Sequence, residues 1–328
     1  MKIAFYDTKP YDRIWFEPMS EQYGHKIKFF EDKLNENTAV LSNGCDAVCV
    51  FVNDTVNAEV VDTLYKQGIK LIALRCSGYN NVDFDATNGR ITVVRVPYYS
   101  PAAVAEHAMA LLLSVNRRIH KAYLRTKDNN FNINGLLGFD LSGKTAGIIG
   151  TGQIGRLFID ICSGFNMNVI AYDAYPKPDY GIDYVSLDEL FERSNVISLH
   201  CPLNKDTYHI INENSIAKMQ ENTFIINTSR GALIDTAALI DGLKSKKLGG
   251  AGLDVYEEES EYFFEDYSNE IVTDDDLQRL LSFPNVIMTS HQGFFTKEAV
   301  KAIAQVTMDN FNRFEKGVIV NEVNHKNA

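Results

Sequence analysis

The sequence lacks several features that would place it in a whole class of proteins. It has no apolar run long enough to span a membrane, no C-x-x-C pair and no block of lysine and arginine, and its five cysteines are odd in number. The formal net charge of -11 argues against a nucleic-acid or anionic membrane surface. No charged leader with an apolar core precedes the first strand-like run, which predicts a cytoplasmic protein with reduced thiols. The expected partner is a small molecule.

What the sequence does contain predicts an α/β fold with two domains. A length of 328 residues with 45% apolar and 23% charged residues suffices to bury two cores. Short β-rich runs alternate with amphipathic segments, the pattern of parallel sheets covered by helices. The expected strands are 2–7, 47–52, 70–75 and 92–96 in the first part, then 144–150, 168–172, 196–200, 223–228, 250–255 and 286–290. The last six match the number in a full dinucleotide-binding sheet.

A break near residue 99 separates the two parts. Ser100 is suited to cap a helix whose first residue is Pro101. The following residues, 102–115, are apolar nearly all round, so we expect this helix to be buried between domains or between subunits. We expect His107 within it to be a hydrogen-bonded core histidine. Helical periodicity returns over 296–316.

The segment Lys144 to Asp173 has the pattern of a nucleotide-binding unit of strand, glycine turn, helix and second strand. Its glycines follow G-x-G-x-x-G: Gly150 for the tight turn, Gly152 for close approach of a pyrophosphate and Gly155 for helix packing. Asp173 ends the second strand, eighteen residues beyond Gly155. Its carboxylate suits a ribose 2'-hydroxyl and repels a 2'-phosphate, so the spacing predicts NAD rather than NADP.

Three later strands end in side chains that suit the chemistry of a 2-oxo or 2-hydroxy acid. Arg230 offers a guanidinium that binds a carboxylate in a bidentate manner. His291 can transfer a proton near neutral pH, and Glu259 can stabilise its charged form and fix its tautomer. Taken singly, a surface arginine, a loop glutamate and a structural histidine are the simpler interpretations. Their occurrence at successive strand ends favours the chemical one.

Two other segments leave alternatives open. The turn at residues 76–83 can present backbone N–H groups to an anion, or it can be an ordinary Gly/Asn turn. The acidic, aromatic segment 257–276 lacks the spacing of a calcium loop, so we expect a solvated loop there and no metal site.

Three motifs resemble the signatures of the D-isomer-specific 2-hydroxyacid dehydrogenases. They are NTSRGALID at 227–235, GLDVYEEE at 252–259 and SHQGFFT at 290–296. The resemblance covers essentially the whole chain. The motifs LRCSGYNNVD, VRVPYYSPAAVAEHA, GKTAGIIGTGQIG and VISLHCPL are similar in particular to the NAD-dependent D-lactate dehydrogenases of fermenting bacteria. Formate dehydrogenases of the same superfamily carry glutamine at the position of Glu259, so the glutamate favours a hydroxyacid substrate.

The resemblance implies a reversible reduction of pyruvate to D-lactate by NADH, with Arg230, Glu259 and His291 as the catalytic set. It implies that the C-terminal helix returns to the first domain, giving a catalytic domain of 1–99 and 297–328 and an NAD-binding domain of 100–296 with the active site in the cleft between them. A homodimer or higher homo-oligomer is expected. The implied substrate contacts are Ser77, Gly78, Tyr99 and Arg230. The implied cofactor contacts are Gly150, Gly152, Gln153, Ile154, Gly155, Asp173, Cys201, Pro202, Thr207, Thr228, Ser229 and Asp254.

Two other functions remain open. The first is a dehydrogenase for bulkier 2-oxo acids, such as phenylpyruvate or 2-oxoisocaproate. The second is a non-enzymatic NAD(H)-sensing protein of the same fold, which the intact set of arginine, glutamate and histidine disfavours.

Overall fold

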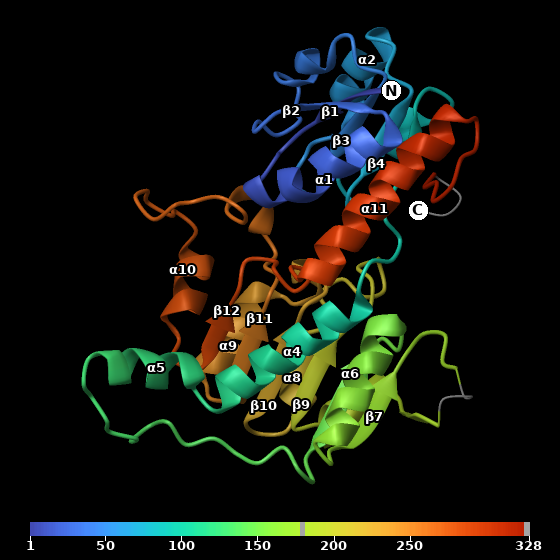
Figure 1. The fold of residues 1–328 in the computed structure, drawn as a ribbon. Coiled ribbons are helices and arrows are strands. Elements are labelled where there is room, and N and C mark those ends of the chain that lie inside the picture. Colours follow the sequence, from blue (N-terminus) through green and yellow to red (C-terminus); the bar gives the residue numbers. More distant parts are fainter. Residues whose placement is uncertain (178–180, 325–328) are drawn as a thin grey trace. The chain divides into compact units, whose positions relative to one another are not determined.

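The computed structural model describes residues 1–177 and 181–324, and the chain divides into two compact units. Unit 1 comprises Met1–Ser100 and Phe295–Ala328, and unit 2 is Pro101–Phe294. The sequence placed these boundaries at 99/100 and 296/297. The chain therefore leaves unit 1, completes unit 2 and returns to unit 1 with its last helix (Figure 1).

Unit 1 is built on a parallel sheet of five strands in the order β2-β1-β3-β4-β5. The strands are β1 (Lys2–Phe5), β2 (Lys26–Phe29), β3 (Ala47–Val50), β4 (Leu71–Leu74) and β5 (Thr92–Val94). This is the strand order of flavodoxin-like folds. The sequence predicted four of these strands and missed β2, an edge strand in which exposed lysines alternate with partly buried apolar residues.

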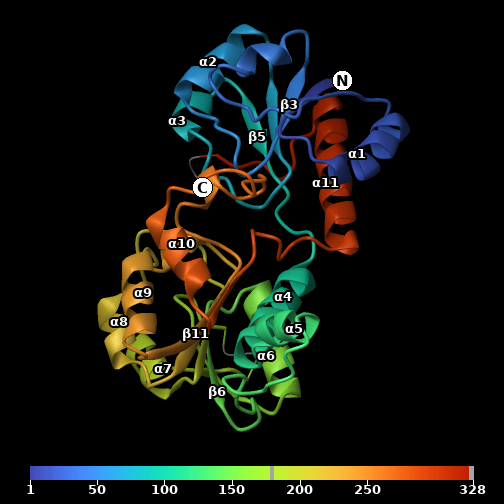
Figure 2. The same cartoon turned by 90° about the vertical axis from the view of Figure 1, so that its left-hand side faces the viewer.

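Helices cover both faces of this sheet, with α1 and α11 on one side and α2 and α3 on the other (Figure 2). The helical segments are α1 (Pro10–Tyr23), the 3-10 turn η1 (Ala39–Ser42), α2 (Ala58–Lys66), α3 (Phe84–Thr87) and α11 (Lys297–Glu315). Ala304, Met308 and Phe311 of α11 pack in one core with Phe5 and Phe16, near the start of the chain. The C-terminal helix is thus part of the core of unit 1, as the resemblance implied.

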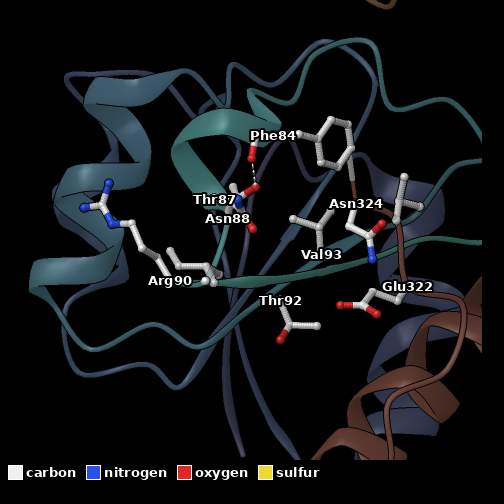
Figure 3. Close-up of a pocket in the computed structure, with 11 residues that line it drawn as sticks. Phe84, Thr87, Asn88, Arg90, Thr92, Val93, Glu322 and Asn324 are labelled. Carbon is white, nitrogen blue, oxygen red and sulfur yellow. Dashed lines mark hydrogen bonds between the residues drawn. The ribbon is translucent and has the colours of Figure 1, made fainter. Parts of the chain in front are cut away.

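After α11 the chain runs along the edge strand β5. Val94 forms an antiparallel bridge with Glu322, and Val323 N donates to Val93 O at 2.9 Å. A cavity of about 510 Å³ lies between α3, β5 and this tail (Figure 3). Arg90 lines it, but its guanidinium is bound to Asp62 of α2 at 2.6 Å. None of the predicted site residues lines this cavity.

Unit 2 contains a parallel sheet of seven strands in the order β12-β11-β10-β9-β6-β7-β8. The strands are β6 (Thr145–Ile149), β7 (Asn168–Tyr172), β8 (Asp183–Tyr184), β9 (Val196–Leu199), β10 (Thr223–Asn227), β11 (Leu248–Leu253) and β12 (Val286–Met288). The order is that of dinucleotide-binding sheets, and its reversal point lies between β6 and β9. The sequence predicted six strands. It missed β8, which has only two residues.

The central strands of unit 2, β6, β9, β10 and β11, are buried on both faces, which is why their sequences are largely continuous apolar runs. In β10, Phe224 and Ile226 pack with α4 and α6, whereas Ile225 packs with α7, α8 and α9. Figure 2 shows these two groups of helices on opposite sides of the sheet. The helical segments are α4 (Pro101–Asn116), α5 (Ile119–Lys127), α6 (Gln153–Gly164), α7 (Leu187–Arg193), α8 (Glu213–Lys218), η3 (Gly231–Leu233), α9 (Thr236–Lys244), η4 (Glu259–Glu261) and α10 (Asp275–Ser282).

Helix α4 begins at Pro101, as the sequence predicted. Its burial between domains or between subunits stays a prediction. Its apolar residues contact α6 and strands β10, β11 and β12 within unit 2. Ala105, Ala108 and Leu112 are fully buried there. Among the described helices, none is both long and apolar enough to cross a membrane. The five cysteines are buried and free.

Candidate active site

The three predicted catalytic residues follow three neighbouring parallel strands of unit 2. Arg230 follows β10, Glu259 follows β11 and His291 follows β12. Strand β11 pairs in parallel with both of the others. Because the carboxyl ends of parallel strands lie at one edge, the topology brings the three residues to the same edge of the sheet, where ligands bind in such folds.

His291 and Glu259 form a directly hydrogen-bonded pair. The distance from His291 Nδ1 to Glu259 Oε1 is 2.7 Å, and the two side chains are 19% and 18% exposed. The second carboxylate oxygen of Glu259 accepts a hydrogen bond from Tyr256 N at 3.0 Å. With Nδ1 facing the carboxylate, Nε2 is the ring nitrogen that can exchange a proton with a substrate.

The backbone around His291 is fixed by Asp254 at the end of β11. The Asp254 carbonyl accepts from His291 N at 2.7 Å, and its carboxylate accepts from Gln292 N at 2.9 Å and Gly293 N at 2.7 Å. His291 itself has a φ of 53°, a left-handed conformation that non-glycine residues rarely adopt. These bonds hold a strained backbone in place at the catalytic candidate, as is common at functional sites.

His107 of α4 joins the same network. Its Nε2 lies 3.0 Å from Thr289 Oγ1 and 3.2 Å from Asp254 Oδ1. Burial alone would raise the pKa of Asp254, but hydrogen bonds from His107, Thr289 and Gly293 hold that pKa below its usual range. The expected hydrogen bonding of His107 is confirmed, although its side chain is 17% exposed, and its partners support the loop of His291.

Arg230 lies in a loop whose backbone is fixed by hydrogen bonds. Asn227 Nδ2 donates to Arg230 O at 2.8 Å, and Asn227 Oδ1 accepts from Ser229 N at 3.0 Å. Ser229 Oγ donates to Cys201 O at 2.7 Å, which links this loop to the end of β9. The Arg230 side chain is partly exposed and one of its nitrogens donates to Ser229 O at 2.7 Å.

The glycine turn after β6 has the geometry of a phosphate-binding turn. Gly150 has a φ of 96°, and a Cβ there would lie 2.6 Å from Cys201 N. A Cβ at Gly155 would lie 2.0 Å from Gly150 O, so helix α6 can pack this closely only with glycine. At Gly152, by contrast, a Cβ would meet no described atom within 4 Å.

Asp173 at the end of β7 is tethered to the glycine turn. Its Oδ2 accepts from the Thr151 backbone N at 2.6 Å and from Thr151 Oγ1 at 2.9 Å, and its Oδ1 accepts from Tyr175 N at 2.8 Å. Partial burial acts to raise the pKa of Asp173, but these hydrogen bonds outweigh it and hold the pKa below its usual range. The carboxylate is therefore ionised at neutral pH.

The remaining predicted contacts lie on loops at strand ends. Thr207 Oγ1 donates to Pro202 O at 2.6 Å and closes the turn that begins at the buried Cys201. In unit 1, Ser77 O accepts from Arg95 Nη1 at 2.7 Å and Gly78 O accepts from Cys76 Sγ at 3.3 Å. The roles of Ser77, Gly78 and Tyr99 in substrate binding stay predictions.

The comparisons with known proteins agree with this arrangement. Residues 109–293 match the family model described as D-isomer specific 2-hydroxyacid dehydrogenase, NAD binding domain. The D-lactate dehydrogenase of Escherichia coli K12 is 50% identical over 321 residues, which cover 97% of this chain and 98% of that protein.

The chain belongs to the D-isomer specific 2-hydroxyacid dehydrogenase family.

Solved structures of the family share both units. The apo-structure of D-lactate dehydrogenase from Escherichia coli matches with a TM-score of 0.89 and 48% identity, covering 98% of this chain and 100% of that one. The structure of D-2-hydroxyisocaproate dehydrogenase matches with a TM-score of 0.86 and 33% identity, covering 98% and 99%. The predicted fold class is confirmed, and the protein is an NAD-dependent dehydrogenase.

The residues of this family member fit NAD. The open space over Gly152 leaves room for a pyrophosphate beside the first turn of α6, which begins at Gln153 and Ile154. Thr228 Oγ1 is buried and, within the described residues, has no hydrogen-bond partner. A carboxamide bound at the carboxyl end of β10 would supply that partner. When bound, the nicotinamide supplies the hydride.

Replacing Asp173 by alanine should narrow the preference for NADH over NADPH substantially. The ionised carboxylate would no longer accept from the ribose hydroxyls or repel a 2'-phosphate. The measurement is the ratio of kcat/KM for the two cofactors in wild type and Asp173→Ala. Asp183→Ala is a matched control, because this carboxylate lies on the edge strand β8. An unchanged ratio in Asp173→Ala would show that this residue does not bind the ribose.

The acidic segment 257–276 differs in part from the expected solvated loop. Phe263 is only 6% exposed and packs in the core of unit 2, and Tyr256 Oη donates to Asp274 at 2.7 Å. Aromatic side chains thus anchor this loop, and Glu257 and Glu259 within it are only 20% and 18% exposed. Among the described residues, no group of three or more His, Cys, Asp or Glu side chains is placed to hold a metal ion.

One pair at this edge was not predicted from the sequence. His209 Nε2 and Glu257 Oε1 lie 2.6 Å apart. The two residues are 48 positions apart and no motif connects them, and Glu257 lies in the segment that was expected to be solvated. The one signal in the sequence for a functional position was that Glu257 directly follows Tyr256, just beyond the expected strand 250–255.

Proposed function

We propose that this protein is a D-lactate dehydrogenase that reduces pyruvate to D-lactate with NADH, reversibly. The observation that carries the proposal is the His291–Glu259 pair, in which Nδ1 and Oε1 are 2.7 Å apart. The pair follows strands β12 and β11, which lie beside β10, the strand that Arg230 follows. The substrate is supported by 50% identity with the D-lactate dehydrogenase of Escherichia coli, compared with 33% for the D-2-hydroxyisocaproate dehydrogenase structure.

Each of the three residues has one task in this reaction. Arg230 binds the carboxylate of pyruvate in a bidentate manner and orients its carbonyl. As a hydride reaches the carbonyl carbon, His291 Nε2 gives its proton to the carbonyl oxygen, and the alcohol forms. Glu259 holds Nδ1–H, which fixes the tautomer and stabilises the imidazolium from which the proton leaves. In lactate oxidation the same proton returns to Nε2.

We propose that the backbone at Ser77 and Gly78, together with Tyr99, also binds the substrate. The turn that holds Ser77 and Gly78 follows β4, at the carboxyl edge of the unit 1 sheet, where ligands bind in such folds. We propose that unit 2 binds the cofactor and that Cys201, Pro202, Thr207, Thr228, Ser229 and Asp254 are among its contacts.

NADH oxidation with a panel of 2-oxo acids tests this function. We expect the highest kcat/KM with pyruvate and D-lactate as the product in chiral analysis. Faster turnover of phenylpyruvate or 2-oxoisocaproate would make the protein a dehydrogenase of bulkier 2-oxo acids. NADH binding without turnover of any member of the panel would favour a non-enzymatic NAD(H) sensor.

We also propose that the protein works in the cytoplasm as a homodimer or a higher homo-oligomer. Five free, buried thiols fit a reducing compartment. Several apolar side chains on the exposed surface of α5 and the loop after it support self-association. These side chains, with their exposed fractions, are Ile119 54%, Tyr123 60%, Leu124 59%, Phe131 74%, Ile133 80% and Leu137 91%.

Introducing charge into this surface should dissociate the oligomer. In the double variant Ile133→Asp/Leu137→Asp, two carboxylates would have to be buried without partners at the interface. Light scattering coupled to size-exclusion chromatography should report a lower mass than for wild type. Ile271→Asp is the matched control, because Ile271 is 88% exposed and lies outside this surface. An unchanged mass in the double variant would place the interface elsewhere.

A further inference from the structure

A second histidine–glutamate pair lies at the same edge of unit 2 as the first. His209 Nε2 is 2.6 Å from Glu257 Oε1, and Thr236 Oγ1 donates to Glu257 Oε2 at 3.0 Å. The His209 and Glu257 side chains are 26% and 20% exposed. Both carboxylate oxygens of Glu257 are therefore engaged in a largely buried setting, where such bonds are strong and directional.

His209 is bonded to two loops that carry catalytic candidates. Its backbone N–H donates to Ala232 O at 2.9 Å, and Ala232 lies two residues after Arg230. Its ring is bonded to Glu257, which lies two residues before Glu259. One residue on a third loop thus connects the segment of Arg230 to the segment of Glu259.

The two connected loops also touch each other directly. A Cβ at Gly231 would lie 2.1 Å from the carbonyl carbon of Tyr256 and 2.4 Å from Glu257 N. The backbone N–H of Tyr256 donates to the Glu259 carboxylate. Because no side chain separates the two backbones, a shift of Glu257 changes the position of the Arg230 loop and of Glu259 together.

The backbone and the ring of His209 are both held in a fixed conformation. Its φ is 49°, in the left-handed region that favours glycine or asparagine, yet the residue carries an imidazole. The Tyr208 ring stacks on this imidazole with centroids 3.9 Å apart and an angle of 18° between the planes. Asn212 Nδ2 donates to His209 O at 2.8 Å. Ring and backbone are both fixed in an unfavourable conformation, which is typical of a functional constraint.

We propose that His209, held by Glu257, is a positioning residue that sets the distance between Arg230 and the Glu259–His291 pair. It exchanges no proton with the substrate. Its effect is to keep Arg230, which binds the carboxylate, and His291, which donates the proton, at the correct distance from each other. This distance matters because misplacement of a reacting group by about 1 Å can lower a rate about 100-fold. The inference rests on the proposed reduction of a 2-oxo acid at this site.

The test is steady-state pyruvate reduction by the full-length NADH-bound enzyme carrying His209→Ala. We expect kcat/KM to fall about 10- to 100-fold. His209→Gln should recover most of this loss, because its amide N–H can still donate to Glu257. The pH of the falling limb of kcat/KM should stay at the wild-type value. The enzyme–NADH complex should also bind oxamate, an unreactive carboxylate of similar shape, more weakly. This affinity should fall most in His209→Ala and less in His209→Gln.

A double variant of His209 and Glu257 distinguishes a positioning role from general destabilisation. Glu257→Ala should lose as much as His209→Ala, and the double variant should lose no more than the worse single one. His120→Gln, on α5 away from these loops, is the matched control and should retain wild-type kinetics. If His209→Ala does not fold, Glu257→Ala carries the same kinetic test.

Wild-type kcat/KM and oxamate affinity in the folded variants, or fully multiplicative losses in the double variant, would overturn the inference. The proposed function fails separately, because it is tested by wild-type turnover and by Arg230 and His291 variants. An active wild type with an unaffected His209→Ala would refute the positioning role alone.

Discussion

Replacing His291 by glutamine should lower kcat/KM for pyruvate by roughly 10²- to 10⁴-fold. Glutamine keeps much of the size and hydrogen-bonding capacity of the imidazole, but it has no proton to release near neutral pH. Carbonyl reduction would then depend on water as the proton source. The measurement is steady-state kinetics with NADH affinity determined separately, so that a defect in cofactor binding is distinguished from a loss of proton transfer.

Replacing Glu259 by glutamine should lower kcat/KM for pyruvate. In the wild type, a carboxylate oxygen 2.7 Å from Nδ1 orients the His291 ring and stabilises the positive charge from which the proton leaves. Glutamine keeps the size of the side chain but removes this charge. Wild-type kcat/KM in Glu259→Gln would mean that Glu259 only closes its loop.

The His291→Gln/Glu259→Gln double variant tests whether the two residues act as one unit. Both serve a single proton-transfer step, so the double variant should lose much less than the product of the two single losses. Fully multiplicative losses would contradict the coupling that the hydrogen bond between them indicates.

Replacing Arg230 by glutamine should cost about 2 to 5 kcal/mol of transition-state stabilisation, since the substrate carboxylate would be left without its charged partner. At 1.4 kcal/mol per factor of ten, this is about 30- to 4,000-fold in kcat/KM. Arg230→Lys should rescue poorly, because an ammonium cannot bind both carboxylate oxygens in a fork and presents no planar pair of donors.

The matched control for Arg230 is Arg193→Gln. Arg193 pairs with Glu189 on the exposed face of α7, so its loss should leave kinetics unchanged. Pyruvate kinetics in Arg230→Gln that equal those of the wild type would remove Arg230 from the site. A loss confined to KM would instead assign it to binding without a role in orienting the carbonyl.

The sequence predicted the strands that are buried on both faces, because these are continuous apolar runs. It missed β2 and β8. In β2, Lys26 and Lys28 alternate with apolar residues at the edge of the sheet, and β8 is too short for any periodicity. The sequence also did not show that α4 packs on the sheet of unit 2, since a helix that is apolar all round does not reveal which surfaces cover it.

The three catalytic candidates were predictable because each follows a recognisable strand, and parallel strands deliver their carboxyl ends to one edge. The support behind them was not predictable. His209 has a φ of 49° and a partner 48 residues away, and neither property leaves a pattern in the sequence. The burial of Phe263 was not predictable either, because this residue lies in an acidic stretch that indicates a solvated loop.

The return of α11 to unit 1 sets the order in which the protein can fold as it leaves the ribosome. Unit 2 is one continuous stretch of chain and can complete its sheet once Phe294 has emerged. Unit 1 is made first but must wait, because Ala304, Met308 and Phe311 cover an apolar sheet face that also contains Phe5. Until the last helix is synthesised, that face stays open to water and to chaperones. Residues of β1 are therefore buried only after unit 2 has been made, although they precede it in the chain.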